Sequence, residues 1–456
     1  MIYNTLIVGA GPAGTGPLIL AARKNKLAEF LDLGVAILDK HTQMGRGCLG
    51  DYIVNSDTYT TVFLECLEGQ EKGGVLDKVI SSKITQSLEK YRDTNAPLSL
   101  VGEFLGEVGD ALQTIIDRHP TSQFFPRTEV HSLQVLADGT ISTSTIRYLT
   151  DNLTIKQKFY SQNVVLALGG KQHLQNLNGD PKFQKLNLSN QVLEKVLLSD
   201  FVLRQAGVNE MQKRLENSSS KKVLIIGGSH SAFAAAWSLL NKLTGVNFSE
   251  GDITILHRSK IKLCYRSREE ALEDGYTDFT EEDICPITQK VYRLGGLRTD
   301  SRELFRQVMG WSQEQQEKRI NLVEIPQDSK ELKNIETYFN QTSLIIYACG
   351  YDSNVIPIFD SEGNEMELLC DHRGSRIDDN GRILLKDGSP LPNILAIGLG
   401  AGLKYSDKLG GEKTFKGEIN GVWIYQNTIG ETIFNQIFDP PTSFGKLKPK
   451  NIDSTR

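Results

Sequence analysis

The chain has 456 residues, of which 39% are hydrophobic and 23% are charged, so it can bury a sizeable core and is not a disordered polypeptide. Its 51 basic and 56 acidic residues give a net charge of −5, which argues against a nucleic-acid-binding protein, because such proteins present a basic surface. At about 100–200 residues per domain, the length predicts two or three domains.

The cysteines, the histidines and the N-terminus exclude several further classes. Six cysteines are scattered without paired spacing, and the seven histidines show no His-Glu-x-x-His pattern, so neither a disulfide framework nor a bound metal is expected. The N-terminus lacks a basic leader, so we expect no signal peptide. The most apolar stretch, Val223 to Leu240, is interrupted by Gly227 and Gly228, which favours a buried strand, turn and helix over a membrane span. A cytoplasmic protein without membrane or nucleic-acid partners is expected.

A glycine-rich turn follows the first apolar strand. Thr5 to Val8 precedes Gly9-Ala10-Gly11-Pro12-Ala13-Gly14, an apolar-periodic helix follows, and Val35 to Asp39 reads as a second strand. This order is typical of the βαβ unit of a doubly wound parallel sheet. The first glycine permits the sharp bend, the second lets the backbone approach a pyrophosphate, and the third lets helix and strand pack closely. The pattern predicts a dinucleotide site in which Asp39 accepts hydrogen bonds from ribose hydroxyls.

The same order returns in the middle of the chain. Val223 to Ile226 precedes Gly227-Gly228-Ser229-His230-Ser231-Ala232, a helix and the strand Ile253 to His257. No acid follows that second strand; Arg258, Ser259 and Lys260 stand there instead. Because a 2′-phosphate repels a carboxylate and pairs with a guanidinium, this arrangement favours NADPH over NADH. The alternative is an ordinary solvated basic cluster.

Two dinucleotide folds in one chain require two dinucleotides. A hydride donor beside a second nucleotide cofactor indicates a flavin, so we assign FAD to the first turn and NADPH to the second. The predicted fold class is α/β, with two doubly wound Rossmann-like domains and a discontinuous FAD-binding domain that the NADP-binding domain interrupts. The expected boundaries are 1–210 for the first part of the FAD-binding domain, 211–350 for the NADP-binding domain, 351–445 for the second part of the FAD-binding domain, and 446–456 for a mobile tail.

Three shorter segments carry expectations of their own. Met211 to Lys222 contains Asn-Ser-Ser-Ser and is expected to be a linker into the second unit. Arg268 to Asp283 is acidic and aperiodic, which is typical of a surface insertion. Val422 to Ile437 is expected to be the last helix, with Asn420 directly before it.

The chain resembles the two-dinucleotide-binding-domain flavoproteins, and within them the class B flavin-dependent monooxygenases: flavin-containing monooxygenases, amine N-hydroxylases and Baeyer–Villiger enzymes. Besides the two turns, the resemblance rests on Val165 to Gly169, on Ile346 to Tyr351, which is similar to the family's crossover strand, and on Ile377 to Gly398, which is similar to the closing strands of its FAD domain. These motifs cover about a quarter of the chain. The family's last strand ends in Gly-Asp, whereas Leu399 follows Gly398 here, so the backbone from Gly400 to Gly402 is expected to take the place of the acid.

The resemblance implies an FAD-dependent, NADPH-consuming monooxygenase. Such an enzyme inserts one oxygen atom from O2 into a small organic substrate through a flavin C4a-hydroperoxide, and the protein excludes water from that adduct and donates hydrogen bonds to it. A homo-oligomer is compatible with this reading. The residues expected to hold the two cofactors are Gly9, Gly11, Pro12, Ala13, Gly14, Asp39, Lys40, Arg46, Val130, Ala167, Gly169, Gly227, Ser229, His230, Ser231, Ala232, Arg258, Ser259, Gly350, Gly398 and Asn420.

The segment after Asp39 carries the candidate catalytic residues. Tyr52 to Ser56 resembles the monooxygenase stretch whose Asn-Ser faces the isoalloxazine ring, so Asn55 and Ser56 are expected there, with Asn55 hydrogen-bonded to the oxygen adduct or to the nicotinamide. A turn with purely local hydrogen bonds accounts for the same residues equally well.

Cys48 supports a rival function. Disulfide reductases of the same superfamily have a cysteine at this place and a second one five residues later, where Ile53 stands here. A single-thiol NAD(P)H-dependent thiol/disulfide or quinone reductase therefore stays open, as do an inert Cys48 and a non-catalytic flavin or nucleotide sensor. The substrate is not encoded in any motif; specificity is expected to lie in Glu65 to Gln123, Gln172 to Gln205 and Ile261 to Gly310.

Overall fold

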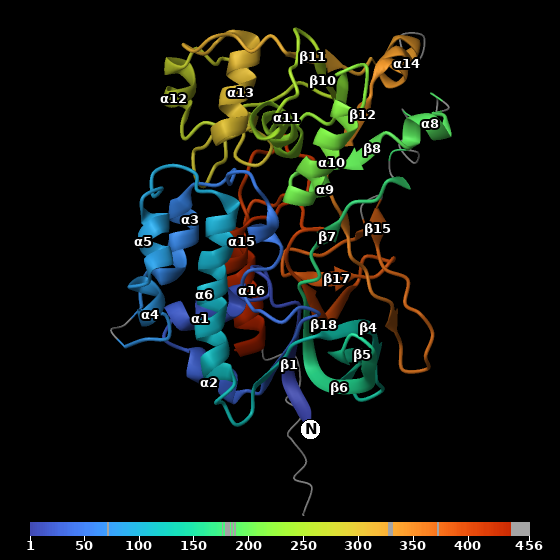
Figure 1. Cartoon of the computed structure of the whole chain (residues 1–456). Helices are drawn as coiled ribbons and strands as arrows, with labels where there is room; N and C mark the ends of the chain where they lie inside the picture. The colour runs from blue at the N-terminus through green and yellow to red at the C-terminus, as the bar shows by residue number, and fades with distance from the viewer. Residues whose placement is uncertain are drawn as a thin grey trace, which may run out of the picture.

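The computed structural model describes residues 1–438, apart from 71–72, 176, 178–182, 184–185, 187, 327–331 and 372–373. The expected tail, 446–456, lies outside the described residues. The chain forms two α/β units, one above the other in Figure 1, and it passes from the first to the second and back again.

The first unit is built on a nine-stranded sheet. Its elements before the crossing are β1 (Ile2–Val8), α1 (Gly16–Arg23), α2 (Leu27–Asp32), β2 (Val35–Leu38), α3 (Thr60–Leu64), α4 (Asp77–Ile80), α5 (Lys83–Glu89), α6 (Leu98–Ile116), β3 (Gln123–Phe125), β4 (Thr128–Val135), β5 (Ile141–Thr150), β6 (Leu153–Leu166) and β7 (Gly170–Lys171). Those after the return are β13 (Asp352–Ser353), β14 (Ile358–Phe359), β15 (Cys370–Asp371), β16 (Gly374–Ser375), β17 (Arg382–Leu384), β18 (Pro390–Ala396), α15 (Val422–Gln426) and α16 (Thr428–Phe438).

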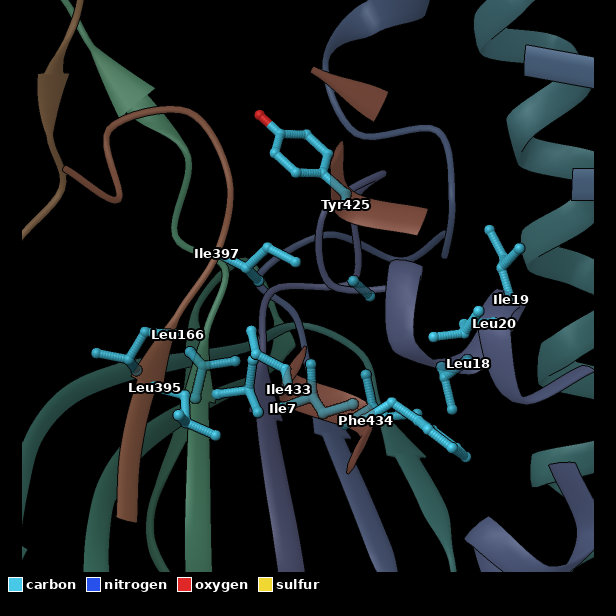
Figure 2. Packing of buried hydrophobic residues seen from close by; sticks show 14 of the residues in the cluster. Ile7, Leu18, Ile19, Leu20, Leu166, Leu395, Ile397, Tyr425, Ile433 and Phe434 are labelled. Carbon is cyan, nitrogen blue, oxygen red and sulfur yellow. The ribbon is translucent and has the colours of Figure 1, made fainter. Parts of the chain in front are cut away.

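Parallel pairing of β1 with both β2 and β6 places the first turn at the middle of this sheet. The last four residues of β1, Thr5 to Val8, are all buried, as a central parallel strand covered on both faces requires. Strand β18 pairs in parallel with β6, so the returning segment completes the same sheet, and the predicted discontinuous architecture is confirmed. Figure 2 shows the core between this sheet and the helices, where Ile7, Leu166 and Leu395 lie near side chains of α1 and α16.

The second unit has a five-stranded parallel sheet in the order β11-β10-β9-β12-β8. Its elements are α8 (Asn190–Leu193), β8 (Val196–Leu198), α9 (Ser199–Val202), α10 (Gln205–Glu216), β9 (Val223–Ile226), α11 (His230–Lys242), β10 (Ile253–His257), α12 (Arg268–Glu273), α13 (Thr299–Met309), β11 (Ile320–Glu324), α14 (Leu332–Gln341) and β12 (Leu344–Tyr347).

Alternate residues of its strands enter two separate cores. Ile225 of β9 packs in one cluster and Leu224 and Ile226 in the other, because successive side chains of a strand point to opposite faces. This burial on both faces is typical of doubly wound sheets and confirms the predicted second Rossmann-like fold.

Three local expectations were wrong. The stretch from Met211 is helical to Glu216 as part of α10, because Val208, Met211 and Leu215 recur at helical spacing and are buried. Strand β8 pairs with β12, so the chain enters the second sheet upstream of residue 211. The segment Arg268 to Asp283 is not a simple surface insertion, since Ala271, Tyr276 and Asp283 within it are buried.

The predicted last helix is interrupted. Helix α15 ends at Gln426 and α16 begins at Thr428, with Asn427 between them outside the helical region. The side-chain amide of Asn427 donates to the carbonyl of Trp423, and its carbonyl oxygen accepts from Arg23 of α1. Side-chain hydrogen bonds of this kind compete with helical backbone bonds and give a physical reason for the break.

The two units also contact each other through a buried polar cluster. The Tyr52 hydroxyl donates to Asp200 of α9 at 2.5 Å, and the Tyr351 hydroxyl donates to the same carboxylate at 3.1 Å. Burial and Asp200 raise the pKa of Tyr52 to about 12, so it stays a donor at neutral pH. Tyr351 directly follows the crossover glycine Gly350, so the cluster joins the first unit, the second unit and the returning chain.

Candidate active site between two nucleotide turns

The first turn is fixed by contacts that only glycine tolerates. Gly9 has φ +98°, and a Cβ there would lie 2.3 Å from the carbonyl oxygen of Ala167. A Cβ on Gly14 would lie 1.8 Å from the carbonyl oxygen of Gly9. Both contacts are far shorter than atoms allow, so these glycines serve the close packing predicted for them.

The backbone of this turn presents hydrogen-bond donors that have no acceptor. Within the described residues, no acceptor lies within reach of the backbone N–H groups of Gly11, Ala13 and Gly14. A Cβ on Gly11 would meet only the Cα of Gly47, at 3.5 Å. Unsatisfied N–H groups ahead of a helix form an anion site, because they carry partial positive charge and point toward the ligand.

Asp39 lies directly after β2 and faces this turn. One of its carboxylate oxygens accepts from the backbone N–H of Ala10 at 2.5 Å, and the other accepts from the backbone N–H of His41 at 2.7 Å. A carboxylate has about four lone-pair sites, so Asp39 retains acceptor capacity for a ribose hydroxyl. Lys40, the next predicted contact, is exposed.

A second loop covers the turn from the other side. The N–H of Gly45 donates to the carbonyl of Ala10 at 2.7 Å, and a Cβ on Gly47 would lie 2.8 Å from the ring of Pro12. Between these glycines, Arg46 has a buried Nε without a hydrogen-bond partner in the described part of the chain. The same guanidinium lies 3.4 Å from Asp51, so Arg46 has one acidic partner and one nitrogen left for an anionic dinucleotide.

The remaining predicted FAD contacts are partly gathered here. Ala167 donates to the carbonyl of Val8 at 2.7 Å, and a Cβ on Gly398 would lie 2.9 Å from the side chain of Ala13. Gly169 has φ +67° and open space where its Cβ would be. Val130 is buried within β4, which continues the same sheet.

The second turn repeats the arrangement. Gly227 has φ +138°, and a Cβ there would lie 2.4 Å from the carbonyl oxygen of Ala348. Within the described residues, the backbone N–H groups of Gly228, Ser229, His230 and Ser231 have no acceptor. Ala232 follows inside α11 and is buried, as a residue packed against the sheet should be. This turn therefore also fits a pyrophosphate at a helix N-terminus.

The segment after β10 carries the predicted basic residues. Arg258 and Ser259 are exposed, and the ring nitrogen Nδ1 of His257 lies 3.0 Å from the carbonyl oxygen of Ser259. Lys260 lies 2.5 Å from Asp278. Arg258 thus occupies the strand-end position next to the second turn, where the 2′-phosphate contact is predicted.

The imidazole of His230 does not point toward the phosphate position. Its Nε2 accepts from the backbone N–H of Arg298 at 3.1 Å, and its Nδ1 lies 3.8 Å from Asp57 of the first unit. Burial lowers the pKa of His230 to about 4, with Asp57 opposing and Arg298 reinforcing the shift. The ring is therefore neutral at pH 7, which the bond accepted at Nε2 requires, and it connects the second turn to the domain interface.

The candidate catalytic pair lies at that interface. The amide of Asn55 donates to Asp300 in the first turn of α13 at 2.9 Å. Ser56 is buried, and its hydroxyl oxygen accepts from the N–H of Thr58 at 3.0 Å, which is a local turn bond. The side-chain hydroxyl of Ser56 therefore makes the local turn bond that was the alternative to a catalytic role. The side chain of Asn55 instead makes a hydrogen bond between the two units.

The other predicted site residues are more dispersed. Cys48 is a free, exposed cysteine. Gly350 has φ +90°, and its carbonyl accepts from Gln172 at 3.0 Å. Asn420 is exposed and lines the cavity described next. Within the described residues, no group of three or more His, Cys, Asp or Glu side chains is arranged to hold a metal, and no helix is long and apolar enough to cross a membrane.

A cavity of about 410 Å³ lies between the two units, and of its lining residues only Asn420 was among the site residues predicted from the sequence. Its lining comes from residues 58–68 and 420–424 of the first unit and from residues 264–302 of the second. The segments Glu65 to Gln123 and Ile261 to Gly310, in which specificity was expected to lie, contain part of this lining. The charged lining residues are Glu65, Glu68, Arg266, Lys290, Arg293, Arg298 and Arg302.

Comparison with known proteins gives one curated relative and a set of solved structures. The relative, CMP-5′-(3-aminopropyl)phosphonate hydroxylase from Streptomyces rubellomurinus, is 29% identical over 437 residues, which is 95% of this chain and 97% of that protein. No family model matches the chain.

Among solved structures, the fold is shared with three monooxygenases. Ornithine N-hydroxylase KtzI from Kutzneria sp. 744, solved with reduced FAD, NADP⁺ and L-ornithine, has a TM-score of 0.52 and 13% identity over 96% of this chain and 99% of its own. The cadaverine monooxygenase DfoA from Erwinia amylovora, bound to FAD, has a TM-score of 0.54 and 11% identity over 96% and 92%. L-Lysine 6-monooxygenase from Pseudomonas syringae has a TM-score of 0.53 and 14% identity over 95% and 99%.

These similarities confirm the predicted two-Rossmann-domain fold. The hydroxylase relative, which matches along almost the whole chain, favours an oxygen-inserting enzyme over the reductase alternative.

Proposed function

We propose that this protein is an FAD-dependent, NADPH-consuming monooxygenase that hydroxylates the amine nitrogen of a small molecule. One observation carries the proposal: two turns with unsatisfied backbone N–H groups, one followed by Asp39 and the other by Arg258, stand in the two units that line a cavity between them. The relative that acts on an aminopropyl compound supports an amine as the acceptor.

The first turn would hold FAD through the N–H groups of Gly11, Ala13 and Gly14, with Arg46 on the phosphates and Asp39 on the ribose. The second turn would hold NADPH through the N–H groups of Gly228 to Ser231, with Arg258 on the 2′-phosphate. When bound, FAD would take a hydride from NADPH and then activate O2, so that one oxygen atom reaches the substrate and the other leaves as water.

The chain's own residues supply binding, orientation and exclusion of water. The hydrogen bond of Asn55 to Asp300 joins the two units. Asp57 of the first unit adds contacts with His230 at 3.8 Å and with Arg298 at 3.9 Å, so both cofactor sites are held in a fixed relation. A closed contact at this place limits the access of solvent to the reacting atoms, which an oxygen-transfer enzyme needs in order to avoid wasteful release of hydrogen peroxide.

The experiment is a turnover assay with isotopically labelled O2. Purified holoenzyme receives NADPH and, separately, CMP-5′-(3-aminopropyl)phosphonate, L-ornithine, L-lysine or cadaverine. We expect one of these amines to yield a hydroxylamine that carries one labelled oxygen atom, with equal consumption of NADPH and O2.

Two results would contradict the proposal. Protein that does not bind FAD would overturn the cofactor assignment. Rapid NADPH-dependent reduction of a disulfide or quinone, with no labelled product from any amine, would indicate the reductase instead.

A further inference from the structure

The cavity between the two units has an unbalanced charge. Its lining contains five cationic side chains and two carboxylates, an excess of three positive charges. All five cations come from the second unit, four of them between β10 and α13 and Arg302 within α13, and both carboxylates come from the first. One carboxylate, Glu65, is 3.5 Å from Arg23, a cation outside the cavity lining. The excess of positive charge is therefore concentrated on one wall.

Three of the five cations have no carboxylate within salt-bridge range. Within the described residues, no Asp or Glu lies in that range of Arg266, Lys290 or Arg293. By contrast, Arg298 lies 3.9 Å from Asp57, and Arg302 lies 3.6 Å from Glu270. Like charges gathered on one wall repel one another, and a ligand of opposite charge relieves that repulsion.

The cations also act on one another. Burial lowers the pKa of Lys290, and the guanidiniums of Arg298, Arg293 and Arg266 lower it further. Such a shift is what uncompensated like charges produce when they share one cavity. The five positive charges of this wall are therefore only partly neutralised within the described part of the chain, through the pairs Arg298–Asp57 and Arg302–Glu270.

Three of the guanidiniums are backed by aromatic rings. Arg266 lies over the ring of Tyr59 at 4.8 Å, Arg293 over Trp423 at 5.3 Å and Arg302 over Tyr265 at 4.7 Å. A ring beneath a guanidinium restricts its orientation. Arg293 also donates to Cys285 and to the carbonyl of Leu409, and Arg302 donates to the carbonyl of Cys264. A planar guanidinium can donate two parallel N–H bonds to two oxygens of one phosphate or phosphonate group.

We infer that the cavity binds a substrate whose amine is attached to a phosphate- or phosphonate-bearing moiety, and that Arg266 and Lys290, with Arg293 beside them, form its anion subsite. This inference rests on the proposed function and specifies its substrate class. A cavity of about 410 Å³ has the size of a small-molecule site, so a nucleotide-sized ligand can enter it.

The phosphates of NADPH are the rival source of negative charge. Their predicted donors, the N–H groups from Gly228 to Ser231 and the side chain of Arg258, do not line the cavity. Arg298 lines the cavity and is hydrogen-bonded to His230 of the second turn, so the experiment has to distinguish binding of the coenzyme from binding of the substrate. The coenzyme site is therefore saturated before the substrate analogue is added.

The test is a calorimetric titration of the FAD-loaded enzyme with uridine 5′-monophosphate, in the presence of saturating NADP⁺. A pyrimidine nucleotide is chosen because the two coenzymes carry adenine. We expect the nucleotide to bind, uridine without the phosphate to bind much more weakly, and added salt to reduce the affinity. Arg266→Gln and Lys290→Gln should each weaken nucleotide binding about tenfold.

Lys242→Gln is the matched control, since Lys242 lies in the last turn of α11 and outside the cavity lining. It should leave nucleotide binding unchanged. Arg266 is exposed, so its replacement should not compromise folding. The inference is overturned if the nucleotide does not bind, if NADP⁺ abolishes its binding, or if Arg266→Gln raises the KM for NADPH and leaves nucleotide binding intact.

These readouts are independent of oxygen transfer. A protein that binds the nucleotide as described but never incorporates labelled oxygen retains the anion subsite and loses the proposed function. A protein that hydroxylates a phosphate-free amine, with no effect of Arg266→Gln or Lys290→Gln, retains the function and loses the subsite.

Discussion

The amide of Asn55 donates a 2.9 Å hydrogen bond to the carboxylate of Asp300, and this bond joins the segment after the first nucleotide turn to the first turn of α13 in the second unit. Asp300 is well placed for this role, because a carboxylate in the first turn of a helix is stabilised by the helix dipole. The contact sets how the two cofactor sites face each other.

Replacement of Asn55 should therefore loosen the interface rather than unfold the protein. We expect Asn55→Ala and Asp300→Ala each to lower the yield of hydroxylated product per NADPH consumed, with the missing electrons appearing as hydrogen peroxide. The double variant should give the same product yield per NADPH as either single variant. In urea unfolding, the coupling energy between the two residues should be about 0.5–1.5 kcal/mol. Additive effects would show that the two residues act separately, and Asn209→Ala on exposed α10 is the control.

The glycines of the first turn should differ in what they support. A Cβ on Gly14 would collide with the carbonyl of Gly9, whereas a Cβ on Gly11 would make an ordinary contact of 3.5 Å. We expect Gly14→Ala to give little folded protein. Gly11→Ala should fold with an unchanged unfolding midpoint but lose FAD, because its methyl group occupies the pyrophosphate position.

Flavin absorbance of the purified protein and its unfolding midpoint measure these two effects separately. Gly106→Ala in α6 is the control, since a Cβ there meets the end of the flexible Gln43 side chain at 3.0 Å and the Cβ of Arg46 at an ordinary contact distance of 3.9 Å. Full retention of FAD by Gly11→Ala would contradict the assignment of the first turn.

The sequence predicted those parts of the molecule that local patterns determine. Thr5 to Val8 and Val223 to Ile226 are short apolar runs before glycine turns, and each is a central parallel strand. Helix α10 was missed although Val208, Met211 and Leu215 carry helical spacing, because the polar run after them suggested a linker. The basic cavity could not be predicted, since Tyr59, Arg266 and Trp423 meet only through the packing of two domains and are separated by hundreds of residues.

Arg258 should determine the choice between the two nicotinamide coenzymes. Arg258→Gln is expected to raise the KM for NADPH about tenfold to a hundredfold, because a charged pair with the 2′-phosphate is lost, and to leave the KM for NADH nearly unchanged. Lys213→Gln, on the exposed surface of α10, provides the control. Steady-state NADPH and NADH oxidation by the same preparation gives both constants. An equal rise for the two coenzymes would show that Arg258 does not contact the 2′-phosphate.

The buried imidazole of His230 should make the stability of the protein depend on pH. Burial lowers its pKa from the ordinary 6.5 to about 4 in the folded state, so the unfolded chain binds the extra proton between these values. The stability due to the neutral ring is complete above pH 6.5 and is lost progressively as the pH falls toward 4. The wild type loses unfolding free energy between pH 7 and pH 4.5. We expect this loss to be smaller in His230→Gln, by an amount on the order of 1–3 kcal/mol.

Urea unfolding of the wild type and of His230→Gln at several pH values measures the difference. His131 is the matched control because its ring is exposed, so His131→Gln should keep the wild-type slope. An identical pH dependence in all three proteins would mean that His230 is not buried in its neutral form at the interface.

Cys48 distinguishes the monooxygenase from the reductase reading. It is an exposed free cysteine, and Ile53 stands where a dithiol relay would have its second thiol, so no disulfide can form between these two positions. We therefore expect Cys48→Ser to retain FAD and to consume NADPH and O2 at the wild-type rate, within about a factor of two. Loss of turnover with retained FAD would instead assign the thiol a redox role, because serine preserves the size of the side chain but cannot form a sulfenate or mixed disulfide.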